Sequence, residues 1–209
     1  MNVLLINPCF NRYAGVKGHG GLSAPLNLAY LASYIRDQRP KAKVTILDAE
    51  AYDLSHEETV EKVMTLKPDL LGITTTTPSF DVTSKLCSQM HDKLPSLPIV
   101  LGGPHATGSP EECASTRGIS AVVLGEGELT FLDIYDAVKD KRSLGNIPGI
   151  CLRANGSVSF TDKRPLIKDL DILPLPARDL LPMHLYFSPP TKSLSEDRAA
   201  NIISSRGCP

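Results

Sequence analysis

Glycines and small hydroxyl residues gather directly after several apolar runs of this sequence. Residues 74–79 are rich in threonine and serine, residues 102–107 read Gly-Gly-Pro-His-Ala-Thr, and residues 125–128 read Gly-Glu-Gly-Glu. Glycine lets a backbone approach a ligand closely because it has no Cβ atom, and hydroxyl groups both donate and accept hydrogen bonds. The combination predicts a surface of bare backbone and hydroxyl groups that suits a large flat ligand.

Several common catalytic and cofactor motifs are missing from these segments. Residues 125–130 lack the last glycine of a dinucleotide fingerprint and place two carboxylates where a pyrophosphate would lie. No P-loop lysine motif and no G-x-S-x-G nucleophile turn is present, and the five histidines lack zinc-site spacing. The sequence therefore argues against nucleotide-phosphate and zinc sites.

Each of these signals also has a purely structural interpretation. The glycines could serve only to form tight turns between strands and helices. His105 could be a polar loop residue and not a ligand. Glu126 and Glu128 could act as general acid or base, or could favour the positive end of a helix dipole at its first turn.

Short apolar runs alternate with helical patterns over the first two thirds of the chain. The runs cover residues 3–7, 44–47, 70–74, 99–101 and 121–124, and capping boxes at residues 55–58 and 109–112 predict two of the helix starts. Other helices are expected over residues 26–36, 81–93 and 128–139. This alternation predicts an α/β fold: a doubly wound, five-stranded parallel sheet of flavodoxin-like or Rossmann-like type, in order 2-1-3-4-5, with ligands at the carboxyl ends of its strands.

The last third of the chain has a different pattern. Residues 150–153 and 158–160 flank Asn155-Gly156 and predict a β-hairpin, and residues 165–190 predict a proline-rich linker. Residues 201–205 predict a new buried strand that leads to Cys208. We expect an α/β domain over 1–142, a hairpin and linker over 143–200, and the start of a further domain over 201–209 whose remainder follows Pro209.

The composition narrows the function classes. The net charge is −1 and basic residues are not clustered, so neither nucleic acid nor an anionic membrane is an expected partner. No apolar run approaches the length of a membrane span, and the N-terminus reads as a strand and not as a signal peptide. Five scattered cysteines without a CxxC pair favour a reducing, cytoplasmic location.

Four segments together resemble a known family. They are residues 25–32 (PLNLAYLA), residues 101–107 (LGGPHAT), residues 125–128 (GEGE) and residues 204–209 (SSRGCP). In this order they are similar to the cobalamin-binding radical S-adenosylmethionine (SAM) enzymes, including the anaerobic magnesium-protoporphyrin monomethyl ester cyclase type. The resemblance covers nearly the whole chain.

The resemblance implies a cobalamin-binding domain at the front of a radical SAM methyltransferase or cyclase that acts on an organic substrate. It implies that Cys208 is the first ligand of a [4Fe–4S] cluster, with the other two cysteines and the SAM site beyond the chain end. The segment around His19 lacks the D-x-H-x-x-G pattern, so we expect cobalamin bound base-off and without a histidine ligand to cobalt. The expected cobalamin contacts are Asn7, Pro8, Thr75, Thr76, Ser79, Gly102, Gly103, His105, Ala106, Thr107, Gly125, Glu126 and Gly127.

Two other classes remain as rivals to this interpretation. A flavodoxin-like interaction or regulatory module would keep the fold and use the glycines only for turns. A phosphoacceptor receiver of this type needs acidic residues where Asn7 and Thr74 stand. An FMN-binding electron carrier needs a phosphate-binding loop after the first strand, and residues 7–11 fit that need poorly.

Overall fold

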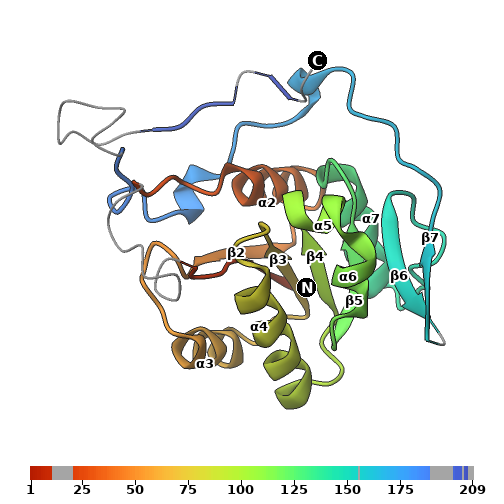
Figure 1. Ribbon diagram of the computed structural model, residues 1–209. Helices are drawn as coiled ribbons and strands as arrows, with labels where there is room; N and C mark the ends of the chain where they lie inside the picture. The colour runs from red at the N-terminus through yellow and green to blue at the C-terminus, as the bar shows by residue number, and fades with distance from the viewer. Residues whose placement is uncertain (11–20, 155, 189–199, 204, 207–209) are drawn as a thin grey trace.

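The computed structural model describes residues 1–10, 21–154, 156–188, 200–203, 205 and 206. Its centre is one seven-stranded sheet in the order β2-β1-β3-β4-β5-β6-β7, which confirms the α/β class and the predicted order of the first strands (Figure 1). The five-strand count was wrong because the hairpin joins the same sheet. The strands are β1 (Asn2–Asn7), β2 (Lys43–Asp48), β3 (Leu70–Thr74), β4 (Ile99–Gly102), β5 (Ile119–Val123), β6 (Ile150–Ala154) and β7 (Ser157–Phe160).

The first five strands are parallel, and the last two are antiparallel. Leu5 pairs with Gly72 and Ile46, and Thr74 pairs with Gly102, so the carboxyl ends of β1, β3 and β4 meet at one edge. Residues of β3 are buried throughout, as expected for a strand covered on both faces. Strand β6 pairs with β5 through Cys151 and Val122, which extends the sheet beyond the parallel part.

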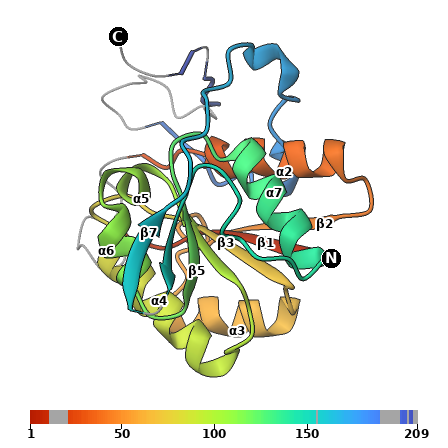
Figure 2. The ribbon, with the colours of Figure 1, turned by 90° about the vertical axis from the view of Figure 1, so that its right-hand side faces the viewer.

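Helices cover both faces of the sheet (Figure 2). Helices α2 (Leu26–Gln38) and α7 (Glu128–Lys139) lie on one face, and the other carries α3 (His56–Leu66), α4 (Phe80–Lys93), α5 (Pro104–Gly108) and α6 (Pro110–Ser115). The capping box at Ser55 is confirmed, since Ser55 and Glu58 exchange both hydrogen bonds. The second box was wrong because Ser109 makes no side-chain cap bond, and α5 replaces the loop expected there.

Alternate residues of each strand supply two separate hydrophobic clusters. Val3 and Leu5 of β1 pack with α2 and α7, whereas Leu4 and Ile6 pack on the α3–α6 side. This alternation follows from the two-residue repeat of a strand. We call these the α2/α7 face and the α3–α6 face.

The segment after β7 runs over the α2/α7 face (Figures 1 and 2). It contains two 3₁₀ turns, Leu170–Ile172 and Arg178–Leu180, and the amide of Ala177 donates to the carbonyl of Ala29 in α2 at 3.0 Å. The strand expected over 201–205 is wrong for the part that the structure describes: Ile202 and Ile203 are in no strand, and their exposed fractions are 83% and 42%. Within the described residues, no helix has the length and apolar character needed to cross a bilayer.

Candidate functional site

Two connected hollows lie at the carboxyl edge of the sheet. The first, which we call the slot, encloses about 240 Å³ between α2 and α7. The second, the basin, is open and holds about 610 Å³ above the strand ends. The two share Asn27, Thr74, Gly103 and Gly125. The slot is also lined by Leu5, Leu28, Tyr30, Leu31, Gly72, Ile73, Val100, Leu101, Gly102, Val123, Glu126, Gly127, Glu128, Phe131, Ile203 and Arg206, and the basin by Asn7, Ser23, Pro25, Thr76, Pro104 and Thr107.

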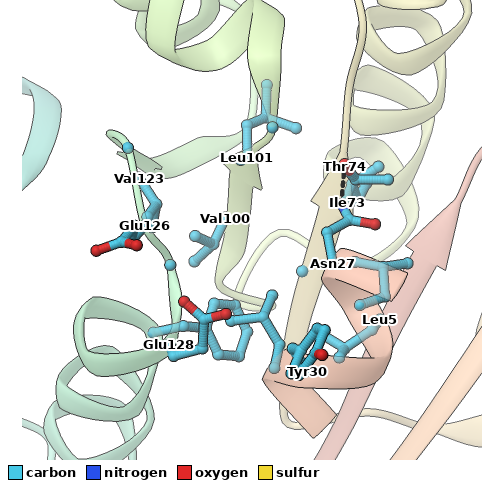
Figure 3. A pocket seen from close by; sticks show the side chains of 18 of the residues that line it. Leu5, Asn27, Tyr30, Ile73, Thr74, Val100, Leu101, Val123, Glu126 and Glu128 are labelled. Carbon is cyan, nitrogen blue, oxygen red and sulfur yellow. Dashed lines mark hydrogen bonds between the residues drawn. The ribbon is translucent and has the colours of Figure 1, made fainter. Parts of the chain in front are cut away.

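A glycine of strand β3, Gly72, lies in the wall of the slot. A Cβ atom on Gly72 would lie 2.8 Å from both Leu5 Cδ2 and Phe131 Cε2, well inside van der Waals contact. Without that Cβ, the Phe131 ring lies directly against β3, and the space between it and α2 remains open. Figure 3 shows Asn27 and Tyr30 on the α2 side of this space and Glu126 and Glu128 on the α7 side.

Backbone conformations that favour glycine shape the place where slot and basin meet. Gly103 has a φ of +100°, and a Cβ atom there would lie 2.7 Å from the carbonyl oxygen of Thr75. Gly125 has a φ of +70°, and its amide donates to Thr107 Oγ1 at 3.0 Å. Both positions disfavour any residue with a side chain, so bare backbone faces the opening.

Amide and carboxyl groups support the rim. Asn27 Nδ2 donates to Thr74 Oγ1 at 2.8 Å, which joins the start of α2 to the end of β3. Asn7 Nδ2 donates to Asp48 Oδ1 at 2.9 Å, and the Tyr186 hydroxyl donates to Asp48 Oδ2 at 2.7 Å. Burial raises the pKa of Asp48, and these two hydrogen bonds oppose that rise. The Asp48 network therefore ties the segment after β7 to the strand ends.

An ion pair closes one side of the slot. Arg206 Nη2 donates to Glu128 Oε1 at 2.6 Å, and Arg206 Nη1 lies 3.5 Å from Glu126 Oε1. The Arg206 guanidinium also lies 5.3 Å from the centre of the Tyr30 ring. Burial alone would lower the pKa of Arg206, but the hydrogen bond and charge of Glu128 raise it overall. A segment far along the chain thus reaches the mouth of the slot.

The structure brings most of the predicted contact residues together. Asn7, Thr76 and Thr107 line the basin, Gly102, Glu126 and Gly127 line the slot, and Gly103 and Gly125 line both. Five others lie elsewhere: Pro8, Thr75, Ser79, His105 and Ala106 line neither hollow, and all five are buried. Cys208 lies outside the described residues.

The buried members of this group support the loops from below. Ser79 Oγ accepts from the Thr76 amide at 2.9 Å, and the carbonyl of Thr75 accepts from the His105 amide at 3.2 Å. The His105 ring centre lies 4.3 Å from that of Phe80, and its Nδ1 lies 3.2 Å from Thr77 Oγ1. His105 is therefore a packing residue that faces α4 and not the basin.

Sequence reasoning missed the α2 and α7 side of the site. Tyr30, Leu31 and Phe131 line the slot from helices, where the apolar pattern predicted only packing. Gly72 was placed in a strand, and an isolated glycine in a buried strand is itself a signal of a close approach. Glu128 was interpreted mainly as a helix-start residue, and its partner Arg206 stands 78 residues away.

Metal-binding clusters give no further candidate. Among the residues that the structure describes, no three histidine, cysteine, aspartate or glutamate side chains are grouped to hold an ion. Of the histidines it describes, none lines the slot or the basin. His19 and Cys208 lie outside the described residues.

Comparisons with known proteins agree with this geometry. Residues 17–134 match the family model for the B12 binding domain. The chain is 36% identical over 220 residues to an uncharacterised methyltransferase of Pyrococcus horikoshii, covering 100% of this chain and 44% of that protein. It is 33% identical over 214 residues to the anaerobic magnesium-protoporphyrin IX monomethyl ester cyclase of Rubrivivax gelatinosus, covering 100% of this chain and 37% of that enzyme. The chain thus spans less than half the length of these relatives.

Solved structures show the same fold. The cobalamin-dependent radical SAM enzyme OxsB, with aqua-cobalamin and S-adenosylmethionine bound, superposes with a TM-score of 0.72 at 20% identity, over 86% of this chain and 24% of that one. The radical SAM methyltransferase TsrM from Kitasatospora setae, with cobalamin and a [4Fe-4S] cluster bound, gives a TM-score of 0.65 at 20% identity, over 77% of this chain and 30% of that one.

Proposed function

Because this chain belongs to the B12 binding domain family, we propose that its slot and basin together bind one cobalamin. The corrin ring lies over the basin, and the nucleotide tail enters the slot between α2 and α7. The observation that carries the proposal is the shape of the site: an open hollow of about 610 Å³ joined to a more enclosed one of about 240 Å³ through Asn27, Thr74, Gly103 and Gly125. Cobalamin has the same two parts, a broad macrocycle and a slender tail.

The two volumes support this division. A cavity of about 150 Å³ lined by apolar side chains is enough to bind benzene. The slot, at about 240 Å³, has room for a two-ring aromatic base but not for a corrin macrocycle. The basin, at about 610 Å³ and open to one side, can take a larger flat group without covering it. Leu31, Val123 and Phe131 give the slot the apolar walls that a benzimidazole base needs.

The groups around the basin suit the edge of a corrin ring. Corrin carries amide side chains around its circumference, and these donate and accept hydrogen bonds. Asn7, Thr76 and Thr107 offer an amide and two hydroxyl groups at the basin. The bare backbone at Gly103 and Gly125 lets the ring lie close to the sheet edge. When bound, cobalamin supplies a cobalt centre for methyl transfer or for electron transfer.

Base-off binding without a protein ligand to cobalt fits the same arrangement. A tail held in the slot cannot also fold back so that its base ligates cobalt. The described histidines do not line the basin, which supports binding without a histidine ligand to cobalt. We therefore propose base-off, histidine-off cobalamin, and we expect a His19→Ala variant to keep the spectrum of the bound cofactor.

For the whole protein, we propose a cobalamin-dependent radical SAM enzyme that methylates, cyclises or oxidatively rearranges a small organic substrate in the cytoplasm. The relatives named methyltransferase and cyclase support this, as does Arg206 at the mouth of the slot, two residues before Cys208. Cys208 would be the first of three thiolates that hold a [4Fe–4S] cluster at which SAM binds. The prediction is two further cysteines, four and seven residues after Cys208, in the downstream sequence.

Titration with hydroxocobalamin, followed by visible absorbance, tests cobalamin binding. We expect a saturable shift that ends at one corrinoid per chain at micromolar concentrations. After reduction to cob(II)alamin, the paramagnetic resonance spectrum should lack nitrogen hyperfine splitting in both the wild type and His19→Ala. A spectrum that does not change on titration would favour the alternative, an interaction module that keeps the fold without a corrinoid.

A further inference from the structure

Glu128 is a buried carboxylate with one oxygen left over. The residue is 4% exposed, although it stands at the first turn of α7. Its Oε1 accepts from Arg206 at 2.6 Å, whereas its Oε2 is buried and has no hydrogen-bond partner among the described residues. Figure 3 shows the carboxylate turned into the slot, toward the space beside Tyr30. Glu128 therefore lines the cavity, and its unpaired oxygen is buried in the wall of the slot.

An unpaired carboxylate oxygen in such a place costs free energy. Water solvates a carboxylate well, and the apolar side chains Leu31, Val123 and Phe131 around the slot cannot replace that solvation. A ligand that donates a hydrogen bond to the second oxygen would offset this desolvation cost. Arg206 already satisfies the first, so its charge holds the carboxylate in place without filling the slot.

The neighbouring carboxylate of Glu126 differs because both of its oxygens have partners in the protein. Glu126 also lines the slot, but its Oε2 accepts from the Ile167 amide at 2.6 Å and its Oε1 lies 3.5 Å from Arg206. Both of its oxygens are therefore used by the protein. Glu128 is the member of the pair that has capacity left for a ligand.

Resting on the proposed function, we propose that Glu128 Oε2 accepts a hydrogen bond from an O–H or N–H donor on the nucleotide tail of the corrinoid. The donor chemistry is shared by two parts of the tail: the ribose hydroxyl, and a hydroxyl or amino group on those lower bases that carry one. Glu128 is then a specificity residue for the tail, and it has no role toward the corrin ring over the basin.

Corrinoids that differ only in the tail test this assignment. We would measure dissociation constants for cobinamide, which lacks the nucleotide, for benzimidazolyl-cobamide, and for 5-hydroxybenzimidazolyl-cobamide, by visible absorbance. Glu128→Leu should weaken each corrinoid whose tail carries the donor about 10- to 100-fold, the range for a hydrogen bond to a charged group, and should leave cobinamide unchanged. An equal loss for both cobamides assigns the donor to the ribose, and a larger loss for the hydroxyl-bearing one assigns it to the base.

Two further variants keep the test decisive. Glu128→Gln keeps the shape and one acceptor oxygen, so it should fold if Glu128→Leu does not, and should lose roughly 3- to 10-fold for the same ligands. Glu61→Leu, an exposed glutamate on α3, is the matched control and should change nothing. Unchanged affinity for both cobamides in folded Glu128 variants, or an equal loss for cobinamide, would overturn the role of Glu128. If no corrinoid binds to the wild type, the proposed function itself fails.

Discussion

The two faces of this sheet are built from neighbouring residues of the same strands, yet their hollows differ in size: the slot on the α2/α7 face has about 240 Å³, and a hollow beside Leu54 and Leu86 on the α3–α6 face has about 10 Å³. On the α3–α6 face, Leu71 and Ile99 are fully buried in one cluster with residues of α4, α5 and α6. On the α2/α7 face, Gly72 follows Leu71 in β3, and it lines the slot together with Leu5 and Phe131, which pack against it. Protein interiors are normally close-packed, so the larger cavity on the α2/α7 face supports the proposal that this face binds the nucleotide tail.

Filling the slot should have the largest effect on binding. A Cβ atom on Gly102 would have only Val123 Cβ as a neighbour, at 4.0 Å, so the Cβ of Gly102→Val fits the fold, and its methyl groups take space from the slot that Gly102 lines. We expect cobalamin to bind at least about 100-fold more weakly, because the tail and the valine compete for one space. Absorbance titration measures the loss.

The matched control for this substitution is Gly108→Val. A Cβ atom on Gly108 meets nothing within 4 Å, and the residue is exposed at the end of α5. Its affinity for cobalamin should equal that of the wild type. If Gly102→Val binds as tightly as Gly108→Val, the slot does not hold the tail.

Removing a buried side chain from the α3–α6 face should lower the stability of the protein and leave its affinity for cobalamin unchanged. Leu71→Ala removes a fully buried side chain from the α3–α6 face. We expect the free energy of unfolding to fall by about 3 kcal/mol, the usual range for a buried leucine, with no change in the affinity of the folded protein for cobalamin. Urea unfolding and absorbance titration of the same preparation measure the two quantities. If the affinity for cobalamin falls by more than the unfolded fraction accounts for, packing on the α3–α6 face affects binding on the α2/α7 face.

The packed face should also respond to alkaline pH. Burial, aided by Glu112, raises the pKa of the Cys113 thiol from its usual 9.0 to about 11. Because the unfolded chain loses this proton at lower pH than the folded one, stability is complete below pH 9 and declines as the pH rises toward 11. Cys113→Ala should show a smaller decline between these values in thermal unfolding. An identical decline in the variant would mean that the thiol titrates alike in both states.

The smallest effect on stability is expected from the ion pair at the outer rim of the α2/α7 face. Arg39, just after α2, donates to Asp136 of α7 through both Nε, at 2.8 Å, and Nη2. This hydrogen bond lowers the pKa of Asp136. Both side chains are partly exposed, so Arg39→Met should cost at most about 1 kcal/mol, and less at high salt. Urea unfolding at two salt concentrations measures this, and a loss that salt does not reduce would contradict a surface ion pair.

The sequence predicted the fold better than it predicted the site. Apolar strands that alternate with amphipathic helices specify a parallel sheet locally, which is why the order of β1 to β5 was correct. The pairing of β6 with β5 joins Cys151 to Val122, and nothing local in either segment indicates it. The apolar pair Ile202 and Ile203 read as a strand, but Ile203 instead lines the mouth of the slot.

The glycine loops were predicted because their composition differs from that of ordinary turns. The basin residues Thr76, Thr107 and Gly103 were therefore among the predicted contacts. The helical wall was not predicted, because Tyr30 and Phe131 have the same sequence pattern whether a helix packs on a sheet or borders a cavity. The Glu128–Arg206 pair depends on the path of the chain after β7. Sequence periodicity shows which face of a helix is buried, but it does not show whether that face is filled.

The comparison of cobalamin with cobinamide, in the wild type and in Gly102→Val, tests the two-part site most directly. Burial of a two-ring base contributes roughly 3 kcal/mol, so the wild type should bind cobalamin about 100-fold more tightly than cobinamide. In Gly102→Val the two ligands should bind alike, at the wild-type affinity for cobinamide. Equal affinities for both ligands in the wild type would contradict a tail held between α2 and α7.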